Sequence, residues 1–532
     1  MKKGLTKVLT VLLGVMLVAG CSGQTGGTSA DANAGGSKEY KDQLVIQNVS
    51  DLTDLDPAYI SGVPTSRIAN LLFDHLVRYD KDGQVVGQLA EKWETSEDGK
   101  TWTFYLHEGV KYHDGSDLTA EDVKFNFDRI KDPQTASPRA SDLEIIDSIE
   151  AKDQTTLVFH LKEPFAAFID KCIIINPTLI ASPKALKEYG KDFTSHPVGT
   201  GPYKFKEWVT GDKVVLEANP DYYLGAPETK QVVFRVMPDP MTAMIEMENG
   251  GLDILQKVLP TEADRIKASD KISLEEAKDY NIRWIFFNEN IAPFDDQKVR
   301  QALTYAVDRA AIHQSLLAGV ADLANGFQPE ISWAYEPDTT PYTYDVEKAK
   351  SLLKEAGWVD ADGDGIVEKD GKKLTVELNV PNGRYLMDKE IMEAVQNQWK
   401  QIGVEPKMNI VEWGKYVENV LAKDKYGVYM LGLSQDNPEP VMFLDMQFHS
   451  KGSNNTSNYK NEKVDKLLEE ARTVVDLNKR KQLYSEAQKL IADDFPVIPL
   501  YSEYNLLAVS KKVEGYQHSA STFDITHVKV AK

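Results

Sequence analysis

The sequence predicts an α/β protein with more than one domain, and three observations support this prediction. The chain has 532 residues, which is more than one domain usually holds. Short apolar or alternating runs typical of strands recur between longer amphipathic runs typical of helices. Hydrophobic residues make up 42% of the chain and aromatic residues 9%, enough for a sizeable core.

The first residues predict a targeting segment. Three lysines precede the apolar run 8–18, which is too short to span a membrane comfortably. The following Val18-Ala19-Gly20-Cys21 resembles the bacterial lipobox, which implies cleavage before Cys21 and a lipid (diacylglyceryl with palmitate-type chains) on its sulfur. An ordinary signal peptide with an incidental cysteine is the alternative. We expect a lipoprotein signal peptide over 1–20 and a flexible, Gly/Ser-rich tether over 21–40.

The net charge and the number of cysteines exclude some classes of binding partner and an internal disulfide. The net charge of −21 argues against nucleic acid and against an anionic membrane surface. We expect a monomer on the extracellular face of a bacterial cell membrane (the periplasmic side in a Gram-negative cell), attached only through the lipid anchor. Besides Cys21 the chain has one cysteine, Cys172, so no internal disulfide can form. Its apolar neighbours predict a buried, unreactive thiol.

Local patterns place the elements in chain order. Thr119 followed by Asp122 is a capping-box pattern, which predicts a helix start at this point. The predicted strands are 44–46, 101–106 and 374–378, and the predicted helices are 64–76, 386–402, 464–475 and 479–492.

No motif of a known catalytic site is present. The chain lacks Gly-x-Ser-x-Gly, His-Glu-x-x-His and a phosphate loop, and its nine histidines are scattered. We therefore predict a protein that is not an enzyme and requires no cofactor.

An acidic stretch, 360–371, begins like a calcium loop. Asp360, Asp362 and Asp364 alternate before a glycine, a spacing that lets carboxylates converge on a hard cation. The twelfth position is Gly371 where an EF-hand needs Glu, so Glu368 or Asp370 would have to serve as the further ligand, with altered geometry. A structural Ca²⁺ and a solvated acidic turn both remain open.

The stretch 428–438 is the candidate site. Its apolar start suits a buried strand, and Asp436-Asn437-Pro438 is typical of a turn. A carboxylate at a strand end can face a cleft and hold an ammonium group, or it can simply cap the turn.

An ordered set of motifs resembles the large extracellular solute-binding proteins of oligopeptide, dipeptide and nickel ABC importers (family 5). The motifs are 109–123, Val198-Gly199-Thr200-Gly201-Pro202-Tyr203, Asn219-Pro220-Asp221-Tyr222-Tyr223, 293–302 and 344–358, and they cover 41–532. We expected Gly199 and Gly201 to supply turn conformations closed to other residues.

The resemblance implies a three-lobed periplasmic-binding-protein-like fold (class C, or cluster C, type) with a hinge and an interlobe ligand cleft. The implied lobe I is discontinuous. Lobe I would comprise 41–76, 197–287 and 503–532, lobe II 77–196, and lobe III 288–502.

The same resemblance implies the function and the site. Asp436 falls on the position that holds a peptide's amino terminus, Gly432 and Ser434 on backbone positions that pair with the peptide, and Trp413 on a site-lining aromatic. The implied role is a lipid-anchored receptor that closes on peptides and delivers them to an ABC permease and ATPase. The alternatives are a nickel or metallophore receptor of this family and, from another class, a calcium-dependent surface adhesin or scaffold.

Overall fold

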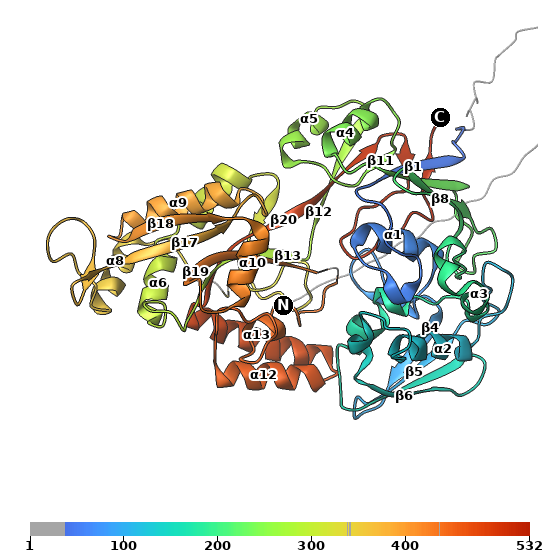
Figure 1. Cartoon of the computed structure of the whole chain (residues 1–532), viewed down its shortest axis with the longest axis horizontal. Coiled ribbons are helices and arrows are strands. Elements are labelled where there is room, and N and C mark those ends of the chain that lie inside the picture. The colour runs from blue at the N-terminus through green and yellow to red at the C-terminus, as the bar shows by residue number, and fades with distance from the viewer. Residues whose placement is uncertain (1–37, 338, 340–341, 436) are drawn as a thin grey trace, which may run out of the picture. The chain divides into compact units, whose positions relative to one another are not determined.

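The structure, a computed structural model, describes residues 38–337, 339, 342–435 and 437–532. Residues 40–532 are built mainly on one large mixed sheet (Figure 1). In spatial order its strands are β18 (Glu405–Val411), β17 (Thr375–Pro381), β19 (Val428–Ser434), β13 (Asn281–Phe287), β20 (Val497–Ser510), β11 (Ile254–Leu255), β1 (Gln43–Asn48), β10 (Gln231–Val236), β9 (Lys213–Ala218) and β8 (Tyr203–Val209). Two further strands, β12 (Ile272–Lys278) and β14 (Ala321–Leu323), also pair with β20.

Strand β20 joins the two halves of this sheet. Its first residues pair with β13 and β14, and its last residues pair with β12 and β11. Because β11 also pairs with β1, a single continuous strand connects the β17–β19 half to the β1–β10 half.

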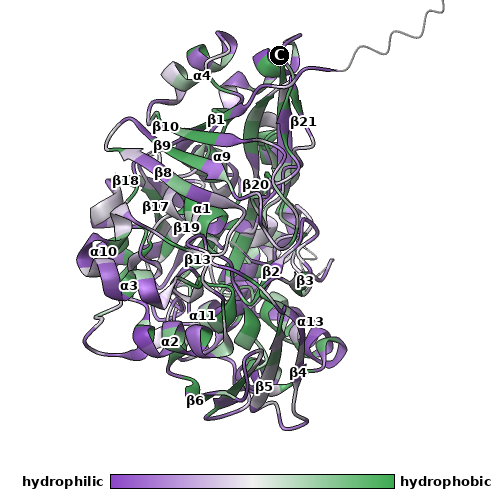
Figure 2. Cartoon of the chain, turned by 90° about the vertical axis from the view of Figure 1, so that its right-hand side faces the viewer, coloured by the Kyte–Doolittle hydropathy of each residue, from purple (hydrophilic) through white to green (hydrophobic). Residues whose placement is uncertain are grey.

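The centre of the sheet is buried on both faces. Along β13, Ile285 and Phe287 belong to one hydrophobic cluster, together with residues of α6, α8 and α9. Trp284 and Phe286 belong to a second cluster, with α10, α12 and α13. This division follows from the period of two along a strand, and it explains why these strands read as continuous apolar runs. Figure 2 shows the hydrophobic residues concentrated in the strands, whereas surface helices such as α2 and α3 are largely hydrophilic.

A separate four-stranded sheet forms its own layer around a third cluster of buried side chains. Its order is β4 (Ala90–Thr95), β5 (Thr101–Leu106), β7 (Thr156–Leu161) and β6 (Ile146–Ala151). The helix that packs on it, α2, begins at the predicted capping box: Thr119 accepts from the Asp122 amide, and the Asp122 carboxylate accepts from the Thr119 amide. The capping prediction is therefore confirmed.

The helices agree with the periodicity of the sequence. They are α1 (Val63–Leu72), α2 (Ala120–Lys131), α3 (Pro183–Tyr189), α4 (Pro240–Glu248), α5 (Ala263–Lys267), α6 (Gln297–Tyr305), α7 (Arg309–Ile312), α8 (Val346–Glu355), α9 (Asp388–Lys400), α10 (Trp413–Leu421), α11 (Asp445–Phe448), α12 (Glu462–Thr473) and α13 (Leu477–Asp494). The remaining short strands are β2 (Val77–Tyr79), β3 (Val85–Gly87), β15 (Glu368–Lys369), β16 (Lys372–Lys373), β21 (Val513–Glu514) and β22 (Lys529–Val530). The helix predicted over 64–76 is shorter than expected, because Phe73 is already extended (φ −128°, ψ 154°).

The reason predicted for glycine at positions 199 and 201, a backbone conformation closed to other residues, is wrong. Neither glycine has a positive φ. Instead, a Cβ on Gly199 would lie 2.2 Å from the Leu72 carbonyl oxygen, and one on Gly201 would lie 2.5 Å from that of Leu71. Both glycines let this turn approach the end of α1, which shapes the wall described below.

The implied lobes map onto these elements as follows. The four-stranded sheet lies within 77–196, whereas the large sheet draws strands from both the lobe I and the lobe III ranges. Strand β20 runs through the implied boundary at 502–503. Residues 1–37, with the predicted signal peptide and Cys21, lie outside the described residues. Across the described helices, none combines the length and the apolar character that crossing a membrane requires.

Candidate functional site

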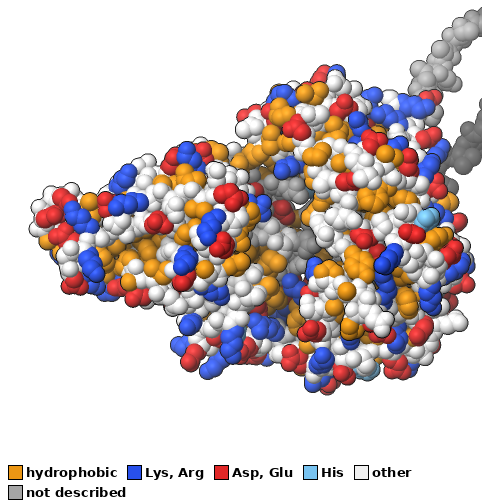
Figure 3. Space-filling model, viewed as in Figure 1, with side chains coloured by type: hydrophobic (Ala, Val, Ile, Leu, Met, Phe, Trp, Pro, Cys, Tyr) orange, Lys and Arg blue, Asp and Glu red, His pale blue; other side chains and the backbone are white. Residues whose placement is uncertain are grey.

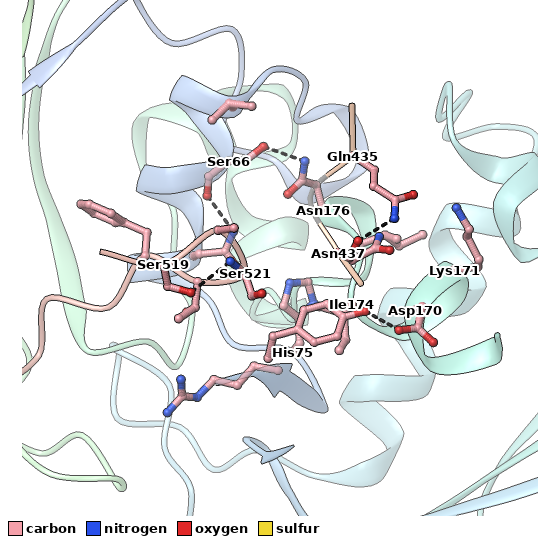
Figure 4. Close-up of a pocket in the computed structure, with 18 of the residues that line it drawn as sticks. Ser66, His75, Asp170, Lys171, Ile174, Asn176, Gln435, Asn437, Ser519 and Ser521 are labelled. Atoms are coloured by element: carbon pink, nitrogen blue, oxygen red, sulfur yellow. Dashed lines mark hydrogen bonds between the residues drawn. The ribbon is translucent and has the colours of Figure 1, made fainter. Parts of the chain in front are cut away.

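A cavity of about 1360 Å³ opens between segments that are distant in sequence. Its walls include α1, residues 163–176, the end of β19 and the C-terminal segment 516–527. In Figure 4, Ser519 and Ser521 lie on the opposite side of the view from Asp170 and Lys171. The volume exceeds the range of roughly 300–1,000 Å³ that is typical of small-molecule sites. The cavity therefore has room for a ligand larger than a single metabolite.

The end of β19 opens into this cavity, as the sequence predicted for the stretch 428–438. Ser434 is the last residue of the strand and lines the cavity. The next residue, Gln435, donates its side-chain amide to the carbonyl oxygens of Asn437 (2.6 Å) and Glu439 (2.7 Å) and so holds the turn (Figure 4 shows the first bond). The buried Gln435 Oε1 has no partner. Asp436, the predicted ammonium ligand, lies outside the described residues.

The edge of β19 beside the cavity is not covered by a second strand. On one side, β13 pairs with all of β19 from Val428 to Ser434. On the other side, the ladder with β17 includes only Val428 and Tyr429. Within the described chain, residues 430–434 therefore have a strand on one edge only. Side chains occupy the first part of this edge, because the Met430 carbonyl accepts from the Tyr416 hydroxyl (2.6 Å) and the Gly432 amide donates to the Tyr385 hydroxyl (3.0 Å). The part beyond the Gly432 amide, which ends at the cavity, can accept an extended chain as an additional strand.

Gly432 and Trp413, unlike Ser434, lie outside the cavity wall. Neither is among the residues that line the cavity. A Cβ on Gly432 would lie 2.3 Å from Arg283 Cδ, so the glycine makes room for the arginine that ion-pairs with Glu503 (3.0 Å). Its amide donates to the hydroxyl of Tyr385 (3.0 Å), against which Trp413 packs edge-on (ring centroids 5.9 Å apart). Both residues thus support the strand indirectly, Gly432 by leaving space for Arg283 and Trp413 by packing against Tyr385.

Charged side chains on the cavity wall fall into two groups. Some are ion-paired, such as Arg78 with Asp524 (3.8 Å), Arg139 with Asp142, and Arg472 with Asp445 (2.6 Å). Others have no ion pair among the described residues. These are Arg67, Glu163, Asp170, Lys171 and Asp279.

Asp279 and Arg67 were missed by the analysis of the sequence. Asp279 separates β12 from β13, and burial raises the pKa of its carboxyl. Burial lowers the pKa of the Arg67 guanidinium to about 10, so it remains charged at neutral pH. The one local signal was a charged Lys278-Asp279 step between two strand patterns. For Arg67, on the polar side of a predicted helix, no local signal existed.

Two other predicted features have clear surroundings. Asp360, Asp362 and Asp364 have carboxylate oxygens within 4.8 Å of one another, all exposed, and Lys373 forms an ion pair with Asp364. Glu368 is not in this group; it lies in β15, opposite Lys373 of β16.

Cys172 is a buried free thiol, and burial raises its pKa, so the predicted burial is confirmed.

Charged side chains of both signs cover the surface. Figure 3 shows Lys and Arg side chains together with Asp and Glu side chains over the face in view.

Comparisons with known proteins identify relatives of this chain. It is 31% identical over 529 residues to the oligopeptide-binding protein AppA of Bacillus subtilis (strain 168), covering 96% of each chain. It is 31% identical over 490 residues to the dipeptide-binding protein of Escherichia coli (strain K12), covering 86% of this chain and 88% of the relative. These relatives are binding proteins, not enzymes.

Solved structures agree with these relationships. AppA in complex with a nonapeptide matches with a TM-score of 0.70 at 30% identity, covering 93% of this chain and all of the other. The periplasmic murein tripeptide binding protein MppA, in an unliganded open form, matches with a TM-score of 0.81 at 25% identity, covering 93% of this chain and 98% of the other. Residues 84–455 match the family described as bacterial extracellular solute-binding proteins, family 5 (middle region). The chain therefore belongs to the family 5 extracellular solute-binding proteins of bacteria.

Proposed function

We propose that this chain is a receptor that binds peptides in the 1360 Å³ cavity and delivers them to an ABC importer. The observation that carries the proposal is the end of β19, which has a strand on one edge only and reaches the cavity at Ser434. A peptide added there as a strand would be held by main-chain groups, so affinity would tolerate many side chains. Relatives that bind oligopeptides and dipeptides support this choice.

Closure of the cavity around the peptide is part of the proposal. The chain matches the open, unliganded MppA (TM-score 0.81) better than it matches AppA with its nonapeptide (TM-score 0.70). This difference supports an open starting state. Strand β20 connects the two halves of the large sheet, so a change in its bend or twist would act as the hinge.

Asp436 is the proposed ligand of the peptide's α-ammonium group. The sequence supports this role, because Asp436 comes two residues after Ser434, the last residue of β19, which lines the cavity. In a closed cavity the ion pair is shielded from water, and truncating one partner costs roughly 2–5 kcal/mol, or about 30- to several-thousand-fold in affinity. Asp436→Asn keeps the shape and removes the charge, so it should abolish most peptide binding while leaving the melting temperature of the empty protein nearly unchanged.

Calorimetry on a four-way cycle tests this role: wild type and Asp436→Asn, each with a peptide and its N-acetylated form. Acetylation should weaken binding to the wild type strongly and to Asp436→Asn very little, since both changes remove one interaction. Glu469→Gln is the matched control, because Glu469 is a carboxylate on another part of the cavity wall. Additive losses would show that Asp436 and the amino group do not meet.

We also propose that the chain is attached to the membrane through a lipid on Cys21. The lipobox-like sequence before Cys21 supports this. Cys21→Ser should release a folded protein from the membrane fraction. Incorporation of a labelled fatty acid into the Ser variant at the wild-type level would refute the assignment.

Delivery to an importer is tested in cells. Cells that lack the protein should fail to take up a labelled peptide. The wild-type gene should restore uptake, and the Asp436→Asn gene should not.

A further inference from the structure

Arg67 is fixed on the cavity wall by its neighbours. The residue before it, Ser66, accepts a hydrogen bond from the side chain of Asn176 (2.6 Å), which ties α1 to the segment 163–176 (Figure 4). The guanidinium lies over the ring of Phe523, with its carbon 5.1 Å from the ring centroid. A guanidinium stacked on a ring keeps its in-plane N–H groups available for other acceptors.

Two side chains that lie beside Arg67 are uncharged at neutral pH. Tyr516 and His518 lie beside it and also line the cavity. Burial raises the pKa of the Tyr516 hydroxyl to about 12, so the phenol is neutral. Burial lowers the pKa of His518 to about 4, so the imidazole is neutral as well. Neither of these two neighbours neutralises the Arg67 cation.

Other arginines of the same cavity differ from Arg67 in this respect. Arg139 pairs with Asp142, and Arg472 pairs with Asp445. Among the described residues, Arg67 has neither an ion pair nor a hydrogen bond from its side chain, although it is partly buried. Keeping a desolvated charge unpaired is costly, so an anion that enters the cavity would be bound favourably.

We propose that Arg67 binds a carboxylate of the ligand, so that the receptor selects peptides that carry a free anionic group. The inference rests on the proposed peptide-binding function and adds a second anchor, on a wall formed by α1 and residues 516–523. The planar fork of arginine matches a carboxylate through two parallel hydrogen bonds. The carboxylate has two possible sources in a peptide: the C-terminus and an acidic side chain.

Calorimetry with synthetic peptides tests the proposal. The probes are alanine peptides of three to six residues, each as free acid and as C-terminal amide, and the same peptides with one Glu or one Gln. Replacing the critical carboxylate by its amide should weaken binding to the wild type about 30-fold or more. Loss on amidation assigns the C-terminus, and loss on Glu-to-Gln exchange assigns a side chain.

The variants locate the partner of this carboxylate. Arg67→Gln should lose about as much affinity for the acid as amidation costs, and should bind acid and amide equally. Arg67→Lys, which keeps the charge but not the fork, should fall in between. Arg139→Gln is the matched control: it removes an arginine charge from the same cavity, but one already paired with Asp142, so it should preserve the preference for the acid.

Several results would overturn the inference. Equal binding of acid, amide, Glu and Gln peptides to the wild type would show that no carboxylate is recognised. If Lys171→Gln abolishes the preference and Arg67→Gln does not, the anion binds on the opposite wall. A lowered melting temperature of empty Arg67→Gln, with the preference intact, would give Arg67 a structural role only. If no peptide of the panel binds the wild type, the proposed function itself fails.

Discussion

Two sets of charged residues, one in the protein interior and one on the cavity wall, are built in opposite ways. Glu439 and Arg480 are almost completely buried, with side chains 1% and 5% exposed, and are joined by two hydrogen bonds of 2.6 and 3.4 Å. Arg67 and Asp279, by contrast, are partly buried and have no ion pair among the described residues.

The difference separates charges that hold the fold from charges that await a ligand. A buried charge whose partner is removed destabilises the protein strongly. A desolvated charge that has no ion pair already lowers stability, so neutralising it should stabilise the empty protein and weaken binding. The sign of the stability change therefore distinguishes the two sets.

Breaking the Glu439–Arg480 pair should have the largest effect. Glu439→Gln leaves the Arg480 charge buried without its carboxylate and should lower the free energy of unfolding by about 3–5 kcal/mol. Chemical denaturation followed by circular dichroism measures it. Glu469→Gln, a carboxylate on α12 that is 58% exposed, is the control and should change stability by less than about 0.5 kcal/mol. A similar small change in both variants would contradict the distinction.

Low pH should turn a neutral group of the cavity into an unpaired charge. His75 is buried, its Nδ1 has no partner, and burial lowers its pKa to about 4. Between pH 6.5 and 4 the unfolded chain binds a proton at His75 that the folded protein does not bind. The contribution of neutral His75 to the free energy of unfolding is therefore fully present above pH 6.5 and is lost as the pH falls towards 4.

The loss attributable to His75 should reach about 3 kcal/mol. Comparing denaturation midpoints of wild type and His75→Gln across this range isolates the contribution. The buried neighbour Asp74, whose pKa is raised to about 6, titrates in both proteins and cancels in the comparison. Parallel pH profiles would rule out the contribution of His75.

Neutralising Asp279 should have the opposite sign from Glu439→Gln. Asp279→Asn removes a desolvated carboxylate and should raise the stability of the empty protein by about 1–2 kcal/mol. The same change should weaken the binding of peptides with a free amino terminus, though less than Asp436→Asn does. Thermal melts and calorimetry on one preparation give both quantities, and a destabilised variant would place Asp279 in the structural set.

The acidic loop should show the smallest effect. Its carboxylates are already hydrogen-bonded by loop amides, as Asp360 is by those of Gly363 and Gly365, and Lys373 competes for Asp364. If the loop binds calcium with the millimolar to submillimolar affinity of extracellular modules, about 1 mM calcium should stabilise the protein by roughly 0.4–1.4 kcal/mol. The test compares melts with calcium and with chelator. Equal shifts in the Asp362→Ala/Asp364→Ala variant would leave only a solvated turn.

Local patterns predicted the elements but not the chemistry of the cavity wall. The strand ending at Ser434 and the cap at Thr119 depend on neighbours a few residues away, so the sequence contains their signal. The position of Arg67 depends on Phe523, more than 450 residues later, and no local pattern encodes that contact. Gly432 is a third case. The resemblance to the family assigns this position to the binding site, but the physical need for a glycine, which is space for the Arg283 side chain, is visible only once β13 pairs with β19.

Strand β20 also dictates when the protein can fold. Strands β1, β11 and β13 are made early, yet the strand that joins their two halves of the sheet ends at Ser510, near the end of the chain. Pairing over such separations raises the contact order and slows folding. The two halves of the large sheet therefore cannot be joined until synthesis is nearly complete. We expect a long-lived, incompletely folded state that chaperones can hold and that a translocation channel for unfolded chains can accept.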